Sequence, residues 1–302
     1  MIVAAQAELF LLDSPLYGEV RGERSIMAFP FFALTKNAQM KPLTYKMNNV
    51  AIEMRPSASG VATIYDKEVI LYIASLIVAK LDRGDTVTQE FSFTANDLFR
   101  VTGTSSSARS YERLSEALTR LQGTQIRTNI EAGGEGEEGW FSWFSEAKTT
   151  YRRGKNDEKR LRSVQVRLCD WLYRAIVKDR RILTYNLAYF DLGPIERRLY
   201  ELARSLCEDG TEFEIVLKQL ALQVGSQDTA ARFKQALKTI VRADELPDYH
   251  IAMHDVVALD PELPLVKRKS GRPKGSTMVT IKPRARSSRP RASLSDRIEA
   301  RP

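Results

Sequence analysis

The residues whose types and spacing most clearly indicate a chemistry begin at Lys267, where the chain runs Lys-Arg-Lys-Ser-Gly-Arg-Pro-Lys-Gly. The Gly-Arg-Pro core is like that of an AT-hook, which lies extended in the narrow minor groove of A·T-rich DNA. Arg272 would place a guanidinium where the groove potential is most negative, because Pro273 fixes φ and Gly271 allows close approach of the backbone. In the common motif an Arg follows the Pro, whereas this chain has a Lys. Phosphate contacts would come from the flanking Lys269 and Lys274.

A basic segment without a fold is the alternative interpretation of this run. Residues 266–302 hold 12 basic and two acidic residues, a net charge of +10, whereas residues 1–265 carry −2. The segment has no aromatic residue and several prolines, so it cannot bury enough apolar surface to fold. We therefore expect a disordered basic tail over 266–302 that binds duplex DNA weakly, with a strong dependence on salt.

Two predicted helices carry polar faces that suit a DNA groove. One follows the serine-rich turn Ser105–Ser107, and the other follows Gly225 and Ser226 and spans residues 228–241. Basic side chains one turn apart on such a face can contact a guanine edge or adjacent phosphates. The candidate DNA-binding residues are Ser106, Arg109 and Arg113 on the first helix, with Glu116 and Arg120 further along the same face, and Arg232, Gln235, Lys238 and Arg242 on the second. The alternative is that both faces are merely solvated.

Two turns between predicted strands differ in charge. Glu131–Gly139 holds four glutamates, which phosphate would repel, whereas Lys148–Arg162 holds seven basic residues and two acids. If one hairpin tip contacts the DNA backbone, it is the second, through Arg152, Arg153 and Lys155. An ordinary solvated hairpin is the alternative.

The predicted order of elements explains how these side chains would be positioned. A strand, a helix with apolar residues from Val69 to Leu81, a short helix, the helix that carries Arg109 and a hairpin follow one another, and a similar order recurs after residue 190. This is the winged-helix plan, in which the last helix enters the major groove. We expect an α+β chain with an N-terminal segment 1–42, two tandem winged-helix domains 43–170 and 171–265, and the tail 266–302.

Other chemistries find no support in the sequence. The chain has no G-x-x-x-x-G-K-[ST] phosphate loop, which argues against an ATP-driven motor. His250 and His254 lie in a predicted strand, where they would be about 13 Å apart and too distant to share a metal. Tyr185 and Tyr189 lack the His-x-His pair that a nicking enzyme needs, so we interpret both as packing residues. We expect no catalytic activity, no cofactor and no metal site.

Cysteine content and hydropathy indicate the compartment. Cys169 and Cys207 match no metal or redox spacing and suit a reducing environment. The longest apolar stretch, Val69–Leu81, is too short to span a bilayer. Glu8 and Asp13 interrupt the apolar N-terminal run, which argues against a signal peptide. We expect a soluble, cytoplasmic protein that does not bind membranes.

A family resemblance is carried by three segments, Ser14–Leu34, Tyr65–Val69 and Leu192–Ala203. Their amino-acid sequences resemble the plasmid replication initiator protein A family, and the resemblance covers roughly residues 10–260. The resemblance implies tandem winged-helix domains that bind repeated sites, called iterons, in double-stranded DNA at a plasmid origin and recruit host replication proteins such as a helicase or an initiator. It also implies autorepression, with monomers on iterons and homodimers on an operator. The AT-hook-like run lies outside the resemblance, and we hypothesise that it holds or bends the A·T-rich stretch that must open.

Two other functions remain open at the level of the sequence. A winged-helix transcriptional repressor without a replication role would bind one inverted repeat near its own promoter, whereas an initiator would bind several direct repeats beside an A·T-rich segment. A nicking enzyme would need Tyr185 or Tyr189 as its nucleophile and would convert supercoiled plasmid to open circles when Mg²⁺ or Mn²⁺ is supplied.

Overall fold

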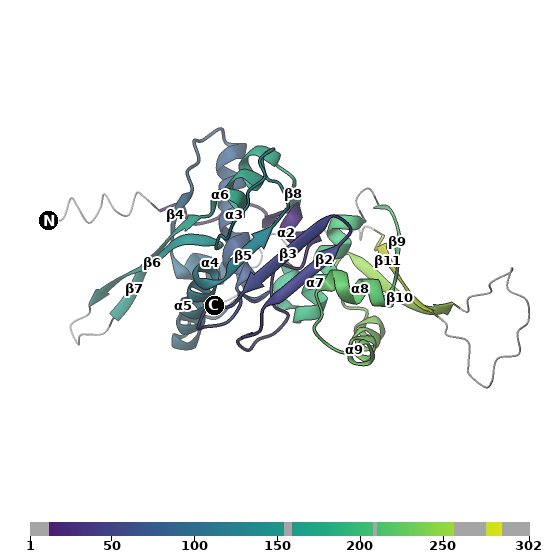
Figure 1. The fold of residues 1–302 in the computed structure, drawn as a ribbon. Helices are drawn as coiled ribbons and strands as arrows, with labels where there is room; N and C mark the ends of the chain where they lie inside the picture. The colour runs from purple at the N-terminus through teal and green to yellow at the C-terminus, as the bar shows by residue number, and fades with distance from the viewer. Residues whose placement is uncertain (1–11, 154–158, 208–209, 257–275, 286–302) are drawn as a thin grey trace, which may run out of the picture.

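The computed structural model describes residues 12–153, 159–207, 210–256 and 276–285, which form an α+β fold with four small antiparallel sheets (Figure 1). Two groups of elements repeat one order: helix, strand, helix, helix and β-hairpin. Unit 1 contains α3 (Lys67–Asp82), β4 (Glu90–Phe93), α4 (Ala95–Thr102), α5 (Ala108–Gly123), β6 (Phe144–Arg153) and β7 (Lys159–Leu168). Unit 2 contains α7 (Pro194–Leu206), β9 (Phe213–Val216), α8 (Leu217–Val224), α9 (Ala230–Ala243), β10 (Tyr249–Val256) and β11 (Ser276–Pro283).

The sheets of the two units share a topology as well. In unit 1 β7 lies between β4 and β6, and in unit 2 β11 lies between β9 and β10. All of these pairs are antiparallel. In both units the strand before the helix pair therefore joins the second strand of the hairpin, which fixes the hairpin beside the helix pair.

β11 corrects the prediction of a disordered tail. Disorder is predicted for all of 266–302, and this is wrong for Ser276–Pro283, which form the central strand of the second sheet. Val279 and Ile281 are fully buried and Thr280 is 4% exposed. These few β-branched residues pair with a strand on each side and so reach a core that the segment alone could not build. Unit 2, predicted to end at residue 265, takes its middle strand from beyond that boundary.

Polar residues begin and end the helices near the predicted positions. Thr94 Oγ1 accepts a hydrogen bond from Asp97 N (3.1 Å) at the start of α4, and Gly103 ends the helix with a φ of 74°. Ser107 caps α5 and Thr229 caps α9 in the same way. The caps fix where each helix begins and therefore which side chains share its exposed face.

The N-terminal segment lies between the two units. β1 (Arg21–Glu23) contacts α3 of unit 1 and pairs with β8 (Ile182–Thr184), and α2 (Arg24–Ala28) packs on α7 of unit 2. The remaining elements are β2 (Leu43–Met47), β3 (Val50–Arg55) and β5 (Gln125–Thr128), which form a sheet, and α6 (Asp170–Arg174), the π-helical turn η2 (Ala175–Asp179) and the 3-10 turn η3 (Leu187–Asp191).

One hydrophobic core runs through both units. Leu71 and Tyr72, in the middle of α3, are fully buried. Tyr185 and Tyr189 are also buried, with ring centroids 4.8 Å apart, which confirms that they are packing residues. The shared core indicates that the two units fold as parts of one body.

The histidines lie on strand β10, as predicted. Among the described residues, no group of three or more His, Cys, Asp or Glu side chains is placed to hold a metal ion. No helix in the described part of the chain has the length and apolar character needed to cross a bilayer.

Candidate nucleic-acid interface

α9 presents basic and amide side chains to solvent. Its buried face is formed by Phe233 and Leu237, both fully buried. The helix contains no Asp or Glu from its first residue to its last. The basic and amide residues exposed on the outer face are Arg232, Gln235, Lys238 and Arg242, as predicted. Within the described residues, none of these four side chains forms a hydrogen bond or an ion pair, so all four are available to a ligand.

A lysine on the flank of α9 ties the helix to its hairpin. Lys234 Nζ donates to Thr277 Oγ1 (2.7 Å) and lies 3.4 Å from Asp255 Oδ1. Thr277 donates to the same carboxylate oxygen (2.6 Å). The hydrogen bond from Thr277 and the contact with Lys234 lower the pKa of Asp255. Helix and hairpin therefore form one continuous surface.

The C-terminal end of α9 is bonded to both strands of the hairpin. Asp244 ends the helix with a φ of 50°. Its carboxylate lies 2.8 Å from His250 Nδ1 on β10 and accepts from Arg284 Nη2 (2.7 Å), just after β11. These hydrogen bonds, with His250 the larger cause, lower the pKa of Asp244. The role of His250 here is structural, because it connects strand β10 to the end of α9.

The turn into α9 is held by the N-terminal segment. Gly225 ends α8 with a φ of 80°, a conformation that glycine adopts without strain. A Cβ at this position would lie 2.5 Å from Pro30 Cβ. The close approach requires glycine here and fixes the helix pair of unit 2 against residues that precede unit 1.

α5 presents a mixed face. Arg109 and Arg113 are exposed and have no hydrogen bond or ion pair within the described part of the chain. They border a cleft of about 580 Å³ formed with the start of α3 and with η3. Glu112 and Glu116 are exposed on the same helix. A phosphate near this helix would meet both signs of charge.

Two polar residues of the predicted face of α5 have partners within the chain. The Ser106 hydroxyl donates to Asn96 Oδ1 (3.0 Å). Arg120 donates through Nε and Nη2 to the two carboxylate oxygens of Asp66, at 2.7 and 2.8 Å. This bidentate pair raises the pKa of Arg120. Arg120 therefore anchors α5 to the start of α3 and does not extend into solvent.

The hairpin β6–β7 brings four basic residues together near its end. The strand register places Arg152 opposite Arg160 and Arg153 opposite Lys159. Lys155, also predicted to contact DNA, lies outside the described residues.

Two glutamates of the acidic turn before β6 form ion pairs with basic residues of the same chain. Glu135 lies 2.7 Å from Lys178 Nζ, and Glu137 lies 2.7 Å from Arg174 Nη2. The side chain of Lys178 and, to a lesser extent, that of Arg174 lower the pKa of Glu135. The turn packs on α6 and η2, so two of its four carboxylates are paired with cations of those two elements.

The AT-hook-like residues lie outside the described residues. They are Lys269, Gly271, Arg272, Pro273 and Lys274. The chain leaves β10 at Val256 and enters β11 at Ser276, and these two residues pair. The run is therefore joined at both ends to one hairpin of unit 2.

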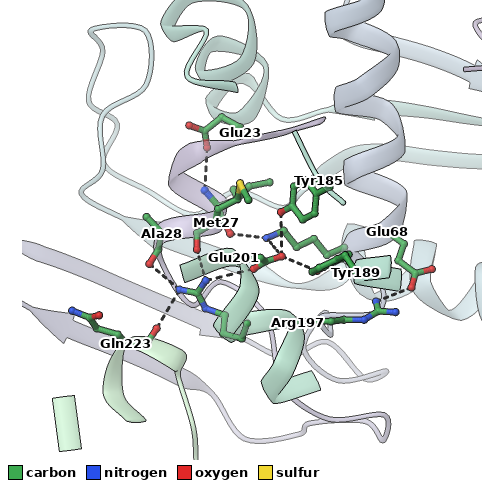
Figure 2. Close-up of polar contacts among 12 residues, drawn as sticks. Glu23, Met27, Ala28, Glu68, Tyr185, Tyr189, Arg197, Glu201 and Gln223 are labelled. Atoms are coloured by element: carbon green, nitrogen blue, oxygen red, sulfur yellow. Dashed lines mark hydrogen bonds and ion pairs between the residues drawn. The ribbon is translucent and has the colours of Figure 1, made fainter. Parts of the chain in front are cut away.

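Three charged side chains between the units were missed by reasoning from the sequence. Lys67, Arg198 and Glu201 are each at most 2% exposed. Figure 2 shows the hydrogen bonds that join Glu201 to the surrounding elements. All three lie in two of the segments that carry the family resemblance. The available signal was the position of Glu201 on α7. This acidic residue stands between Tyr200, which is fully buried, and Leu202, which is 2% exposed.

Comparisons with known proteins agree on a family and a fold. The family model described as replication initiator protein A matches residues 21–251. A protein assigned to replication in Wigglesworthia glossinidia brevipalpis is 34% identical over 246 residues, which are 81% of this chain and 88% of that protein.

Crystal structures of two domains of RctB share the fold. Two crystal structures of domains 2 and 3 of RctB align with TM-scores of 0.59 and 0.53, at 15% and 13% identity, and each alignment covers 83% of this chain and 94% of the other. The Pi initiator protein, solved in complex with iteron DNA, aligns with a TM-score of 0.48 at 14% identity, over 74% of this chain and 92% of the other.

Proposed function

We propose that this chain, which belongs to the replication initiator protein A family, binds repeated sites in duplex DNA at a replication origin. The observation that carries the proposal is the outer face of α9. Four basic or amide side chains are exposed there, and none has a hydrogen bond or ion pair within the described residues. Family membership supports the role in replication, and this face supports the means of binding.

Each unit is, in this proposal, a winged helix. The repeated order of elements and the common sheet topology support this assignment. The last helix of the pair, α5 or α9, would then enter a major groove, and the following hairpin would contact the adjacent backbone. Two such units in one chain would contact successive grooves of a single site.

The side chains of α9 match the acceptors of base edges. Arg232 and Lys238 can donate to O6 and N7 of guanine, and Gln235 can form two hydrogen bonds with adenine. Arg242, in the last turn, would contact a phosphate. The four positions share one face because they follow one another at helical spacing.

The AT-hook-like run would add affinity for A·T-rich DNA beside the repeats. Its proposed contacts are those of Arg272 with the minor groove and of the neighbouring lysines with phosphates. Deleting 266–302 would not test this, because the deletion also removes β11. The sharper test replaces Arg272 and Lys274 by Ala and keeps the strand. Loss of protection over the A·T-rich stretch alone is expected, and unchanged protection would contradict this contribution.

Binding to three duplexes tests the main proposal. Fluorescence anisotropy would compare direct repeats from the origin, the inverted repeat nearest the coding sequence and a scrambled duplex. Preference for the direct repeats by at least about 1,000-fold over the scrambled duplex is expected, in the range of specific DNA-binding proteins. Equal affinity for all three would overturn the proposal. Binding to the inverted repeat alone would favour a transcriptional repressor.

Permanganate reactivity tests the initiation step. Thymines in the A·T-rich stretch of a supercoiled origin plasmid should become reactive when the protein binds, and a plasmid without the repeats serves as the control. Reactivity that does not depend on the repeats would contradict the proposed role.

A further inference from the structure

A cluster of buried charges, the polar junction, joins the N-terminal segment to both units (Figure 2). We define it as Lys67 of α3, Arg198 and Glu201 of α7, and the three backbone carbonyls of α2 that these cations bind. Lys67 Nζ lies 2.7 Å from Glu201 Oε1, with both side chains at most 1% exposed. Burial lowers the pKa of Lys67 to about 8, and the adjacent Glu201 opposes that shift. Lys67 is thus mostly charged at neutral pH.

The cations of the junction bind the C-terminal end of α2. Lys67 Nζ donates to the carbonyl of Ile26 (2.7 Å), and Arg198 donates to the carbonyls of Met27 and Ala28, the latter at 2.8 Å. The last carbonyls of a helix have no partner within the helix, and cations are favourable there. One short helix is therefore held by a side chain from each unit.

Glu201 collects further donors from the segment between the units. The hydroxyl of Tyr189 donates to Glu201 Oε1 (2.7 Å), and that of Tyr185 donates to the same oxygen (3.2 Å). Burial, with Glu201 nearby, raises the pKa of both tyrosines well above its usual value. Both hydroxyls are therefore protonated donors, and neither is an exposed nucleophile.

The junction extends to the helix pair of each unit. In unit 2, Arg198 Nη2 also donates to the carbonyl of Gln223 (3.2 Å), in the last turn of α8 before α9. In unit 1, Asp66 directly precedes Lys67 and holds Arg120 of α5 in the bidentate pair described above. A continuous path of ion pairs and hydrogen bonds, with the peptide bond between Asp66 and Lys67, thus leads from α5 to the turn that sets the direction of α9.

Burying several charges is a poor way to gain stability. The cost of removing both ions from water roughly cancels their attraction, so a buried ion pair is weak evidence for stability. Buried ion pairs do, however, favour a single geometry, because any displacement of the elements that carry them leaves a buried charge without its partner. The arrangement suits a fixed orientation of one unit relative to the other.

We propose that the polar junction sets the separation and angle between α5 and α9, so that Lys67, Arg198 and Glu201 determine which spacing of DNA elements the chain accepts. The three are positioning residues that act through the two helices and do not touch DNA. This inference rests on the proposed function for its DNA consequence, whereas its structural half can be measured without DNA.

The test replaces the ion pair by neutral side chains of similar size. The variant Lys67→Met with Glu201→Gln removes one positive and one negative charge and retains an acceptor for the tyrosines, while Arg198 keeps its hydrogen bonds to the three backbone carbonyls. Its matched control is Lys178→Met with Glu135→Gln, an exposed ion pair of the same 2.7 Å length between η2 and the turn before β6. Circular dichroism and thermal unfolding would establish that both variants are folded.

The first measurement is the distance between the helices. Nitroxide labels on Thr119→Cys and Thr239→Cys, both exposed, report it by double electron–electron resonance. We expect one narrow distribution in the parent and the control, and a shifted or broadened one in the junction variant. A folded junction variant with the parent distribution would overturn the proposal. If that variant does not fold, Arg198→Lys, which keeps the charge but cannot reach all its carbonyls, replaces it under the same criteria.

The second measurement is tolerance of altered spacing. Duplexes would carry one, two or three extra base pairs between the segments protected by the two units. The parent should lose at least about tenfold in affinity over this series, and the junction variant should lose less than about threefold, because each mismatched contact removes a comparable factor. A uniform loss on all duplexes, with the parent profile kept, would overturn the spacing role. If the parent binds no repeat at all, the proposed function fails, and the distance measurement still decides the structural half.

Discussion

α5 and α9 occupy the same position in their units and carry different outer faces. α9 has no acidic residue among 14, whereas α5 has Glu112 and Glu116 among 16. α5 is anchored through Arg120 to the start of α3, and α9 is tied through Lys234 to its own hairpin. On this contrast we propose a division of roles, in which α9 contacts base edges and α5 contacts the DNA backbone at a fixed distance.

The largest loss of DNA affinity is expected from substitutions in α9. Arg232→Ala with Lys238→Ala should weaken binding to the specific duplex about 100-fold or more, since a good base contact contributes about 1–3 kcal/mol. Binding to a scrambled duplex should fall only several-fold. Anisotropy titrations measure both, and Lys41→Ala with Lys46→Ala removes the same charge from exposed positions on and beside β2. Equal losses on both duplexes would show that α9 contacts phosphates only.

Substitutions in α5 are expected to cause a smaller loss of DNA affinity, and one that discriminates less between specific and scrambled duplexes. Arg109→Ala with Arg113→Ala should weaken binding to specific and scrambled duplexes alike, by about tenfold, and lower the slope of log K against log salt by about 2. Titrations at four salt concentrations measure the slope. A loss confined to the specific duplex would assign base contacts to α5 and remove the contrast.

Removing an acid from α5 should have a modest effect of opposite sign. Glu112→Gln should raise affinity for any duplex about two- to threefold at low salt, and the gain should disappear as salt screens the repulsion. Glu138→Gln, in the acidic turn, is the control with the same charge change. A gain from the control as large as that from Glu112→Gln would mean that only net charge matters.

The smallest effect is expected at the flank of α9. Lys234→Met removes a contact with the largely exposed Asp255, so the free energy of unfolding should fall only slightly. Urea unfolding measures this, and affinity for the specific duplex should stay within twofold. A large loss of affinity without loss of stability would instead place Lys234 at the DNA.

Local chemistry made much of the fold predictable. Thr94, Ser107 and Gly103 mark helix ends because a hydroxyl cap or a left-handed glycine acts within a few residues of itself. The buried and exposed faces of α9 follow from spacing alone. The structure accordingly agrees with the predicted positions of α5 and α9 and with the exposure of Arg109, Arg113, Arg232, Lys238 and Arg242.

What could not be predicted depends on partners far along the chain. Lys67 meets Glu201 across 134 positions, and Arg120 meets Asp66 across 54. Spacing along one helix contains no information about such pairs, so Arg120 was expected to face solvent. β11 was not predicted for the same reason, since its short apolar run becomes a strand only when β9 and β10 lie on either side.

The central place of β11 also bears on synthesis. β9 and β10 leave the ribosome before the strand that must lie between them, so unit 2 cannot close until the chain has grown past Pro283. A polypeptide that stops earlier would carry α9 without half of the hairpin beside it. Under the proposed function, fragments of the protein would therefore compete poorly for origin sites, and only molecules translated past this strand would support initiation.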